Sequence, residues 1–220
     1  KSKLIFLGSP NHVSGQTIKN DSEWKNFYKK IPDNVIIVFD QRYDDFVYKQ
    51  KELDKSVSNA INPLKLLKSN KNVIVFRSFN NFYSVENLEL CYLVASKSIA
   101  ELFKNSQVIN PIDKFTENLA LTVIDDPYYQ KTKKKIQEER QRMMRTLTKS
   151  NINYYESDTN FFLVETNSNK DSIMAELENE NIILYNSMEG YNDYWTLPLG
   201  EKKTNDTVLD ILRYDNLENN

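Results

Sequence analysis

The sequence predicts an α/β protein with a mostly parallel sheet, followed by a smaller α+β region. Two short apolar runs, residues 4–7 and 35–39, are expected to be strands, and a helix with an apolar stripe is expected over residues 22–30. Strand, helix and strand with short joins are typical of the βαβ unit of a parallel sheet. Ligands usually bind at the carboxyl ends of such strands, so Asp40, which follows the second run, is a candidate site residue.

The stretch of residues 73–96 is expected to contribute a buried strand and a return strand. Residues 73–76 are an unbroken apolar run, and residues 88–95 hold a second apolar run after a polar corner. Such a corner often places side chains at a sheet edge that faces a ligand. Cys91, the one cysteine, lies in the second run, so we expect a buried structural thiol.

Helical patterns dominate the chain after this stretch. Helices are expected over residues 98–103, 113–124 and 128–148. Pro127 is expected to close the second of them, because proline cannot continue a helix. The long third helix carries a basic run, residues 131–135, among Glu and Arg, which we interpret as a solvated face.

The second region mixes strands and helices. Its expected strands are residues 161–165, 182–185 and 194–199, and its expected helices are residues 170–178 and 205–212. Residues 216–220 at the end of the chain are expected to fray. We therefore assign residues 1–127 to a large domain, residues 128–150 to a bridging helix and residues 151–220 to a small α+β domain.

Composition excludes several function classes. The chain has 220 residues, of which 27% are charged, and its net charge of -2 gives no footprint for nucleic acid or an anionic membrane. No apolar run approaches the roughly 20 residues that a membrane-spanning helix needs. A single cysteine excludes an internal disulfide and fits a reducing, cytoplasmic compartment. The chain opens with Lys rather than Met, so we expect its true start to be missing.

A series of short motifs runs through nearly the whole chain. They are LGSPNHVSGQTI, PDNVIIVFDQRYDDFV, RSFNNFY, ALTVIDDPYY, SDTNFFLVE and YWTLPLGEKKTND. In this order they resemble the motifs of pyridoxal-phosphate-dependent aminotransferases of class I/II, in the histidinol-phosphate aminotransferase group. The resemblance implies a three-layer αβα large domain, a small C-terminal domain and a homodimer. It covers only the later three-fifths of such an enzyme, so we expect a front portion to be missing.

Several residues match cofactor-contacting positions of that family. Asp40 matches the aspartate that pairs with the pyridinium nitrogen, Tyr43 the tyrosine that hydrogen-bonds the ring hydroxyl, and Ser78 a hydroxyl donor to the phosphate. His12, the one histidine, replaces an asparagine that contacts the ring hydroxyl. These matches imply a pocket for pyridoxal 5′-phosphate held without a covalent bond. From the residues alone, Asp40 also fits a helix cap and His12 a surface residue.

Four other positions depart from the family pattern. Asn81 stands at the lysine position, and its neutral amide can neither form the Schiff base nor shuttle a proton. Glu89 stands where an arginine would neutralise the phosphate, so attraction is replaced by repulsion. Thr196 and Tyr185 stand where arginines lie near the substrate. The resemblance therefore implies a degenerate site, with no catalytic residue for ordinary transamination.

Three functions stay open at this point. The first is a pseudoenzyme of the aminotransferase fold that acts as a binding or scaffold protein. The second is an enzyme that holds pyridoxal or pyridoxamine phosphate without a covalent bond, with His12 or a residue of the missing front as base. The third is a pocket for another small ligand, cationic in view of Asp40, Glu86 and Glu89.

Overall fold

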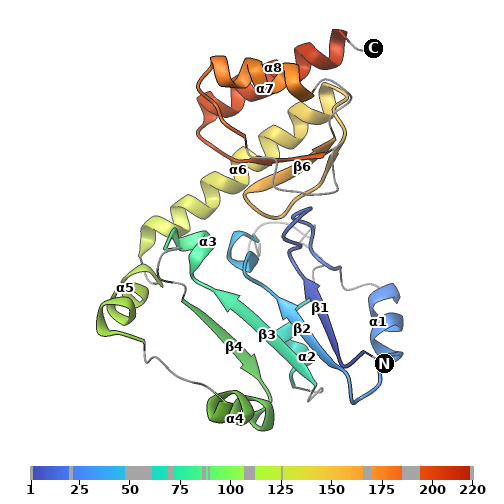
Figure 1. The fold of residues 1–220 in the computed structure, drawn as a ribbon, viewed down its shortest axis with the longest axis vertical. Coiled ribbons are helices and arrows are strands. Elements are labelled where there is room, and N and C mark those ends of the chain that lie inside the picture. Colours follow the sequence, from blue (N-terminus) through green and yellow to red (C-terminus); the bar gives the residue numbers. More distant parts are fainter. Residues whose placement is uncertain are drawn as a thin grey trace. The chain divides into compact units, whose positions relative to one another are not determined.

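The computed structural model describes most of the chain and divides it into two compact units (Figure 1). The described residues are 2–19, 22–47, 61–68, 72–85, 88, 90–106, 112–124, 126–165, 170–184 and 194–218. Unit 1 holds Lys1–His12 and Thr17–Lys131, and unit 2 holds Val13–Gln16 and Thr132–Asn220. The division at Lys131 falls inside a helix, and the boundaries expected at residues 127 and 150 stay predictions.

Unit 1 is built on a four-stranded sheet in the order β1-β2-β3-β4. Its strands are β1 (Leu4–Gly8), β2 (Ile36–Asp40), β3 (Val73–Ser78) and β4 (Cys91–Ala95). The first three strands are parallel, and β4 returns antiparallel to β3. The prediction of a mostly parallel sheet is therefore confirmed.

One face of this sheet carries the core of unit 1. Ile37, Phe39 and Val75 are fully buried against helices α1 (Ser22–Lys29) and α2 (Pro63–Leu66). Trp24 of α1 meets the ring of Phe39 edge-on, with 5.5 Å between the ring centroids. Aromatic pairs in this geometry contribute beyond the area they bury, so Trp24 anchors α1 on the sheet.

Short helices follow the strand ends, and longer ones follow β4. They are η1 (Asp44–Phe46), α3 (Asn80–Tyr83), α4 (Lys97–Ser106), α5 (Lys114–Ile124) and α6 (Pro127–Lys149). Asp113 caps α5 by accepting from the amide and hydroxyl of Thr116 at 2.9 and 2.7 Å. Pro127 is the first residue of α6, where its missing N–H costs nothing, and Asp126 accepts from the amide of Tyr128 at 2.8 Å.

Two expectations for unit 1 are corrected. The polar corner after β3 begins with the helical turn α3, because the Ser78 hydroxyl accepts from the amide of Asn80 at 3.0 Å. Cys91 is exposed, whereas we expected a buried thiol. It opens β4, which is an edge strand of the described sheet and has a neighbouring strand only on the β3 side.

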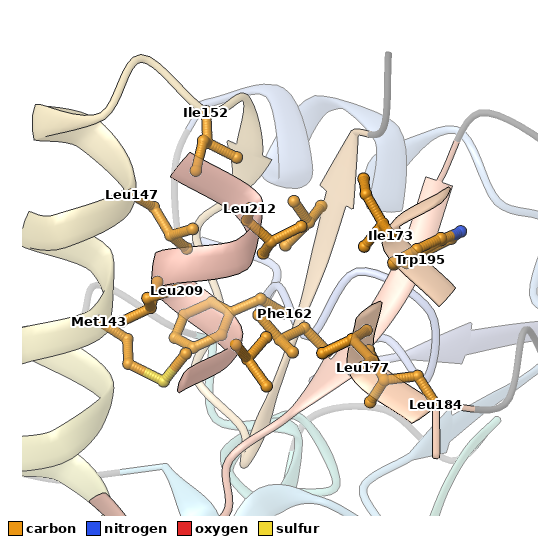
Figure 2. Close-up of a cluster of buried hydrophobic side chains, with 13 residues drawn as sticks. Met143, Leu147, Ile152, Phe162, Ile173, Leu177, Leu184, Trp195, Leu209 and Leu212 are labelled. Atoms are coloured by element: carbon orange, nitrogen blue, oxygen red, sulfur yellow. The ribbon is translucent and has the colours of Figure 1, made fainter. Parts of the chain in front are cut away.

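Unit 2 combines a three-stranded antiparallel sheet with helices. The strands are β5 (Tyr154–Tyr155), β6 (Phe161–Glu165) and β7 (Tyr194–Pro198), and most of α6 packs here with α7 (Lys170–Asn179) and α8 (Lys202–Glu218). Figure 2 shows the buried cluster, in which Met143 and Leu147 of α6 lie beside Phe162 and Leu209. The apolar residues of the long helix therefore serve packing, as their spacing predicts.

The sequence prediction misplaced three elements of unit 2. Residues 182–184 are not a strand, because Asn181 adopts φ 59° and the Ile182 amide closes the end of α7 on Leu177 at 2.8 Å. Strand β5 was not expected. Helix α8 begins three residues before Asn205, whose side chain reaches back to accept from the Gly200 amide at 2.9 Å. It also continues through Glu218, so residues 216–218 are helical where fraying was expected.

Candidate functional site

The carboxyl ends of β2 and β3 place the predicted site residues in unit 1. Asp40, the last residue of β2, lies in register between Gly8 of β1 and Phe76 of β3. The backbone around it is fixed, because its carbonyl accepts from Ser9 and the next amide, that of Gln41, donates to Phe76 at 2.8 Å. Ser78 ends the neighbouring strand β3. The structure therefore brings Asp40 and Ser78 to the ends of adjacent strands.

The carboxylate of Asp40 is held by Arg42. Arg42 Nε lies 3.0 Å from both carboxylate oxygens, its Nη2 lies 2.7 Å from Oδ2, and its backbone amide lies 3.1 Å from Oδ1. The side chains are 43% exposed for Arg42 and 24% for Asp40. The hydrogen bond to Asp40 raises the pKa of the Arg42 guanidinium above its usual value. A forked guanidinium-carboxylate contact of this kind is short and charge-assisted.

A buried polar cluster lies directly behind this pair. The Arg77 Nη2 of β3 donates to Asp44 Oδ2 at 2.6 Å and to Gln41 Oε1 at 3.2 Å. Gln41 Nε2 in turn donates to Asp44 Oδ1 at 3.2 Å, so three side chains satisfy one another. Gln41 and Asp44 are buried. Because Arg77 is committed to this cluster, its role is to join β2, η1 and β3.

The hydroxyl of Ser78 is turned to backbone groups. It is buried, it accepts from the Asn80 amide at 3.0 Å, and it donates to the Leu90 carbonyl at 3.4 Å. Asn81 follows on α3 and is half-buried. The local fold therefore uses Ser78 to start α3 and to tie it to the segment before β4.

The other predicted site residues are less closely gathered. Tyr43 is half-buried and its ring lies 6.1 Å from that of Phe46, between centroids. His12 is exposed. Thr196 lies on β7 of unit 2, opposite Leu163 of β6. Glu86, Glu89 and Tyr185 lie outside the described residues.

Sequence reasoning missed a cavity beside β4. It has a volume of about 770 Å³, and its walls come from β3, α3, β4 and α5. Its lining includes Ser78, Phe79, Tyr83, Cys91, Tyr92 and Leu121. Burial, with a smaller contribution from Asp45, raises the pKa of Tyr83 to about 12, so this phenol stays protonated at neutral pH. The sequence of residues 73–96 carries no signal for such a space, because α5 supplies the far wall.

The described residues include neither a metal-ligand cluster nor a membrane-spanning helix. Within the described ranges, no group of three His, Cys, Asp or Glu residues is placed to hold a metal ion. The helices of the described part of the chain include none that is both long and apolar enough to cross a bilayer.

Comparison with known proteins finds one family over most of the chain. The family model for aminotransferase class I and II matches residues 1–190. A histidinol-phosphate aminotransferase from Brevibacillus brevis is 27% identical over 97% of this chain and 57% of its own length. Another, from Halalkalibacterium halodurans, is 23% identical over 96% of this chain and 55% of its own length. The chain thus spans little more than half the length of these relatives.

Solved structures show the same fold. Histidinol-phosphate aminotransferase from Clostridium acetobutylicum superimposes with a TM-score of 0.79 at 20% identity, over 98% of this chain and 64% of that one. The enzyme from Sinorhizobium meliloti, in complex with pyridoxal-5′-phosphate, gives a TM-score of 0.75 at 19% identity, over 99% and 58%. Together with the family match, these similarities lead to one conclusion: the chain belongs to the aminotransferase class I and II family, as a histidinol-phosphate aminotransferase-like member.

Proposed function

We propose that this protein has the aminotransferase fold without ordinary transaminase activity, and that it serves as a binding or scaffold protein. The observation that carries the proposal is Asn81, which stands on α3 where the family motif has lysine. An amide is neither a nucleophile toward an aldehyde nor a base at neutral pH. No lysine lies between Asn72 and Ser96 to replace it. Loss of the general acid-base group alone removes about 10²–10⁴-fold in rate.

The surroundings of Asn81 support the same proposal, because the residues present do not fit pyridoxal phosphate. The carboxylate of Asp40 already binds the Arg42 guanidinium through both oxygens. The hydroxyl of Ser78 is buried and bonded to two backbone groups. The Asp40 carboxylate would have to leave Arg42 before it could bind a ring nitrogen, and the Ser78 hydroxyl would have to leave its backbone partners before it could bind a phosphate. Glu89, which lies outside the described residues, adds like charge where the family motif has arginine.

A second function is kept because the chain retains three family residues. Asp40, Tyr43 and Ser78 match cofactor-contacting positions, and the first and last of them end adjacent strands. If Arg42 swung away from Asp40, pyridoxal or pyridoxamine phosphate could be held without a covalent bond. A cationic small ligand has weaker support, since Asp40 is already neutralised by Arg42.

A titration with pyridoxal phosphate tests the first function against the second. Absorbance spectra of the full-length protein would be recorded with and without borohydride, beside an Asp40→Ala variant. We expect no reducible adduct that depends on Asp40, and no conversion of the cofactor when amino acids are added. Saturable binding that is lost in the variant would support the non-covalent enzyme. A borohydride-fixed adduct at a single lysine, located by peptide mass spectrometry and absent from the variant, would contradict the absence of covalent chemistry at this site.

We also propose that the protein forms a homodimer. The support is a set of large apolar side chains that stay exposed on α4 and α5. Leu102, Phe115 and Leu121 are 66%, 72% and 61% exposed. Exposed apolar side chains of this size are available to a contact between two copies of the chain. Sedimentation equilibrium at micromolar concentration is expected to give twice the chain mass, and a monomer would contradict the proposal.

A further inference from the structure

We infer that Arg42 is an internal counter-ion of Asp40, and that it prevents this carboxylate from pairing with a cationic ring nitrogen. The inference deepens the proposed function and rests on it, since it assumes that Asp40 stands at the nitrogen-binding position. It names a residue that would determine whether the pocket accepts a pyridine ring at all. The motif that resembles the family's D-E-A-Y reads DQRY here, so arginine stands where the family motif has alanine.

The geometry of the Arg42–Asp40 pair explains why Arg42 would compete with a ligand for this carboxylate. Arg42 meets both carboxylate oxygens of Asp40, with its closest approach at 2.7 Å. The backbone amide of Arg42 donates to the same carboxylate at 3.1 Å. This bond stabilises the turn that directs the guanidinium back toward Asp40. Only one residue separates the two partners, so the arginine is always present at high local concentration. A free ligand loses translational and rotational entropy when it binds, whereas Arg42 is already tethered to Asp40 by the chain.

Charge explains the direction of the effect. A pyridine nitrogen is held protonated by a carboxylate only if that carboxylate is free to accept its hydrogen bond. The guanidinium is permanently charged and its planar fork matches the two oxygens. A second cation would therefore have to displace the first. An alanine at this position has no such group to offer.

Other charged side chains around Arg42 do not relieve this competition. Arg77, the basic residue of β3, is bound to Asp44 and Gln41. The Asp40 interaction is the largest of the influences that raise the Arg42 pKa.

Variants at position 42 test the inference in the full-length protein. Arg42→Ala removes the whole side chain, and Arg42→Met keeps an apolar stem of similar length without the charge. We expect both to bind pyridoxal phosphate about tenfold or more tightly than the unaltered protein, as measured by absorbance titration, since a charge-assisted pair is removed from competition. The double variant Arg42→Ala/Asp40→Asn is expected to lose this gain.

A matched control is Arg213→Ala, which breaks an exposed Arg-Asp pair with Asp210 in unit 2. It is expected to leave pyridoxal phosphate binding unchanged. Equal affinity of the unaltered protein and both position 42 variants, checked for folding by circular dichroism, would overturn the inference. A gain that persists in the double variant would also overturn it, because the effect would then not pass through Asp40.

These outcomes are separate from the test of the proposed function. A reducible adduct at a single lysine that is absent from the Asp40→Ala variant would overturn the absence of covalent chemistry at this site, whatever Arg42 does. Conversely, failure of the position 42 variants to gain affinity would remove the role of Arg42 and leave the argument from Asn81 in place.

Discussion

At the scale of single residues, Gly15 shows how one backbone conformation fixes a polar turn. Its φ is 71°, in the left-handed region that favours glycine. Its carbonyl accepts from the Asp158 amide at 2.9 Å, within unit 2. An added Cβ would overlap the hydroxyl of Ser157 and lie 2.8 Å from that of Thr159. Both of these hydroxyl groups belong to buried residues that bond to each other.

We therefore expect Gly15→Ala to destabilise the protein by about 2 kcal/mol, through backbone strain and overpacking together. Urea unfolding followed by circular dichroism checks this value. Gly200→Ala is the matched control, because its Cβ would come no closer than 3.4 Å to a neighbouring atom. Equal effects of the two substitutions would show that the turn at Gly15 tolerates a side chain.

Tyr83 gives a prediction about alkaline pH. Burial raises its pKa to about 12 in the folded protein, whereas an unfolded tyrosine titrates near 10. The unfolded state therefore loses this proton first, and folding stability falls as the pH rises from about 10 to 12. Tyr83→Phe is expected to flatten that fall in urea unfolding curves. NMR titration of labelled tyrosine rings would contradict the argument if every resonance moved near pH 10.

At the scale of elements, the cluster of Gln41, Asp44 and Arg77 joins three segments. Asp44 and Arg77 are 8% and 15% exposed, so the ion pair between them is largely removed from water. Removal of one partner from such a pair leaves the other charge without compensation. We expect Asp44→Asn to lower the free energy of unfolding by about 3 kcal/mol.

The control for this substitution is Asp210→Asn, which neutralises the exposed partner of Arg213. Exposed pairs contribute about 0–1 kcal/mol, so little change is expected there. Chemical denaturation of both variants under the same conditions gives the comparison. A loss below about 1 kcal/mol for Asp44→Asn would mean that water replaces its role.

A second network joins α6 to α8. Glu139 Oε1 accepts from Arg142 Nη2 at 2.6 Å and from the side-chain Nδ2 of Asn205 at 2.8 Å, and Arg142 also forms an ion pair with Asp206. The Arg142 hydrogen bond holds the pKa of Glu139 below its usual value of 4.5. This contribution to stability is present above the unfolded pKa and is lost as the pH falls through the folded one.

Glu139→Gln is accordingly expected to make stability less dependent on pH at and below about 4.5, at a cost of about 1 kcal/mol at neutral pH. Urea midpoints across that range provide the test. An unchanged pH profile would show that Glu139 titrates alike in the folded and unfolded states.

Most elements of the fold could be predicted from local sequence signals. The unbroken apolar runs before Asp40 and Arg77 predicted two parallel strands, and both are present. The failures occur where a backbone hydrogen bond decides the outcome. The Ser78 hydroxyl starts α3 within the expected polar corner, and the Ile182 amide bonds to the end of α7 where a strand was expected. Such short-range competition leaves no periodic signal.

At the scale of the whole molecule, each unit has its own buried cluster. Ile37 in unit 1 and Leu177 in unit 2 are both fully buried. We expect Ile37→Ala and Leu177→Ala each to cost about 3 kcal/mol, because each leaves a cavity in a packed core.

Hydrogen exchange with mass spectrometry would locate the two effects. Each substitution is expected to lower protection first in the unit that contains it. Uniform loss of protection across all peptides in either variant would contradict separate cores. The matched pair controls for side-chain type, since both are large aliphatic residues replaced by alanine.

Local sequence signals placed one candidate site residue but none of its contacts. The end of an apolar run placed Asp40 at the carboxyl end of a strand, whereas Ser78 was named only from the family resemblance. The ion pair of Asp40 with Arg42 could not be predicted, since it depends on the turn that directs the guanidinium back. Absence of lysine at Asn81, by contrast, is a property of the sequence itself.

The two units are interleaved along the chain. Val13–Gln16 belongs to unit 2, although unit 1 supplies the residues on both sides of it. The carbonyl of Gly15, in this short segment, accepts a hydrogen bond from the backbone amide of Asp158. An exchange of unit 2 between relatives by recombination would therefore need two crossovers near the front of the chain as well as one in α6. A single breakpoint would separate this tetrapeptide from the turn it completes.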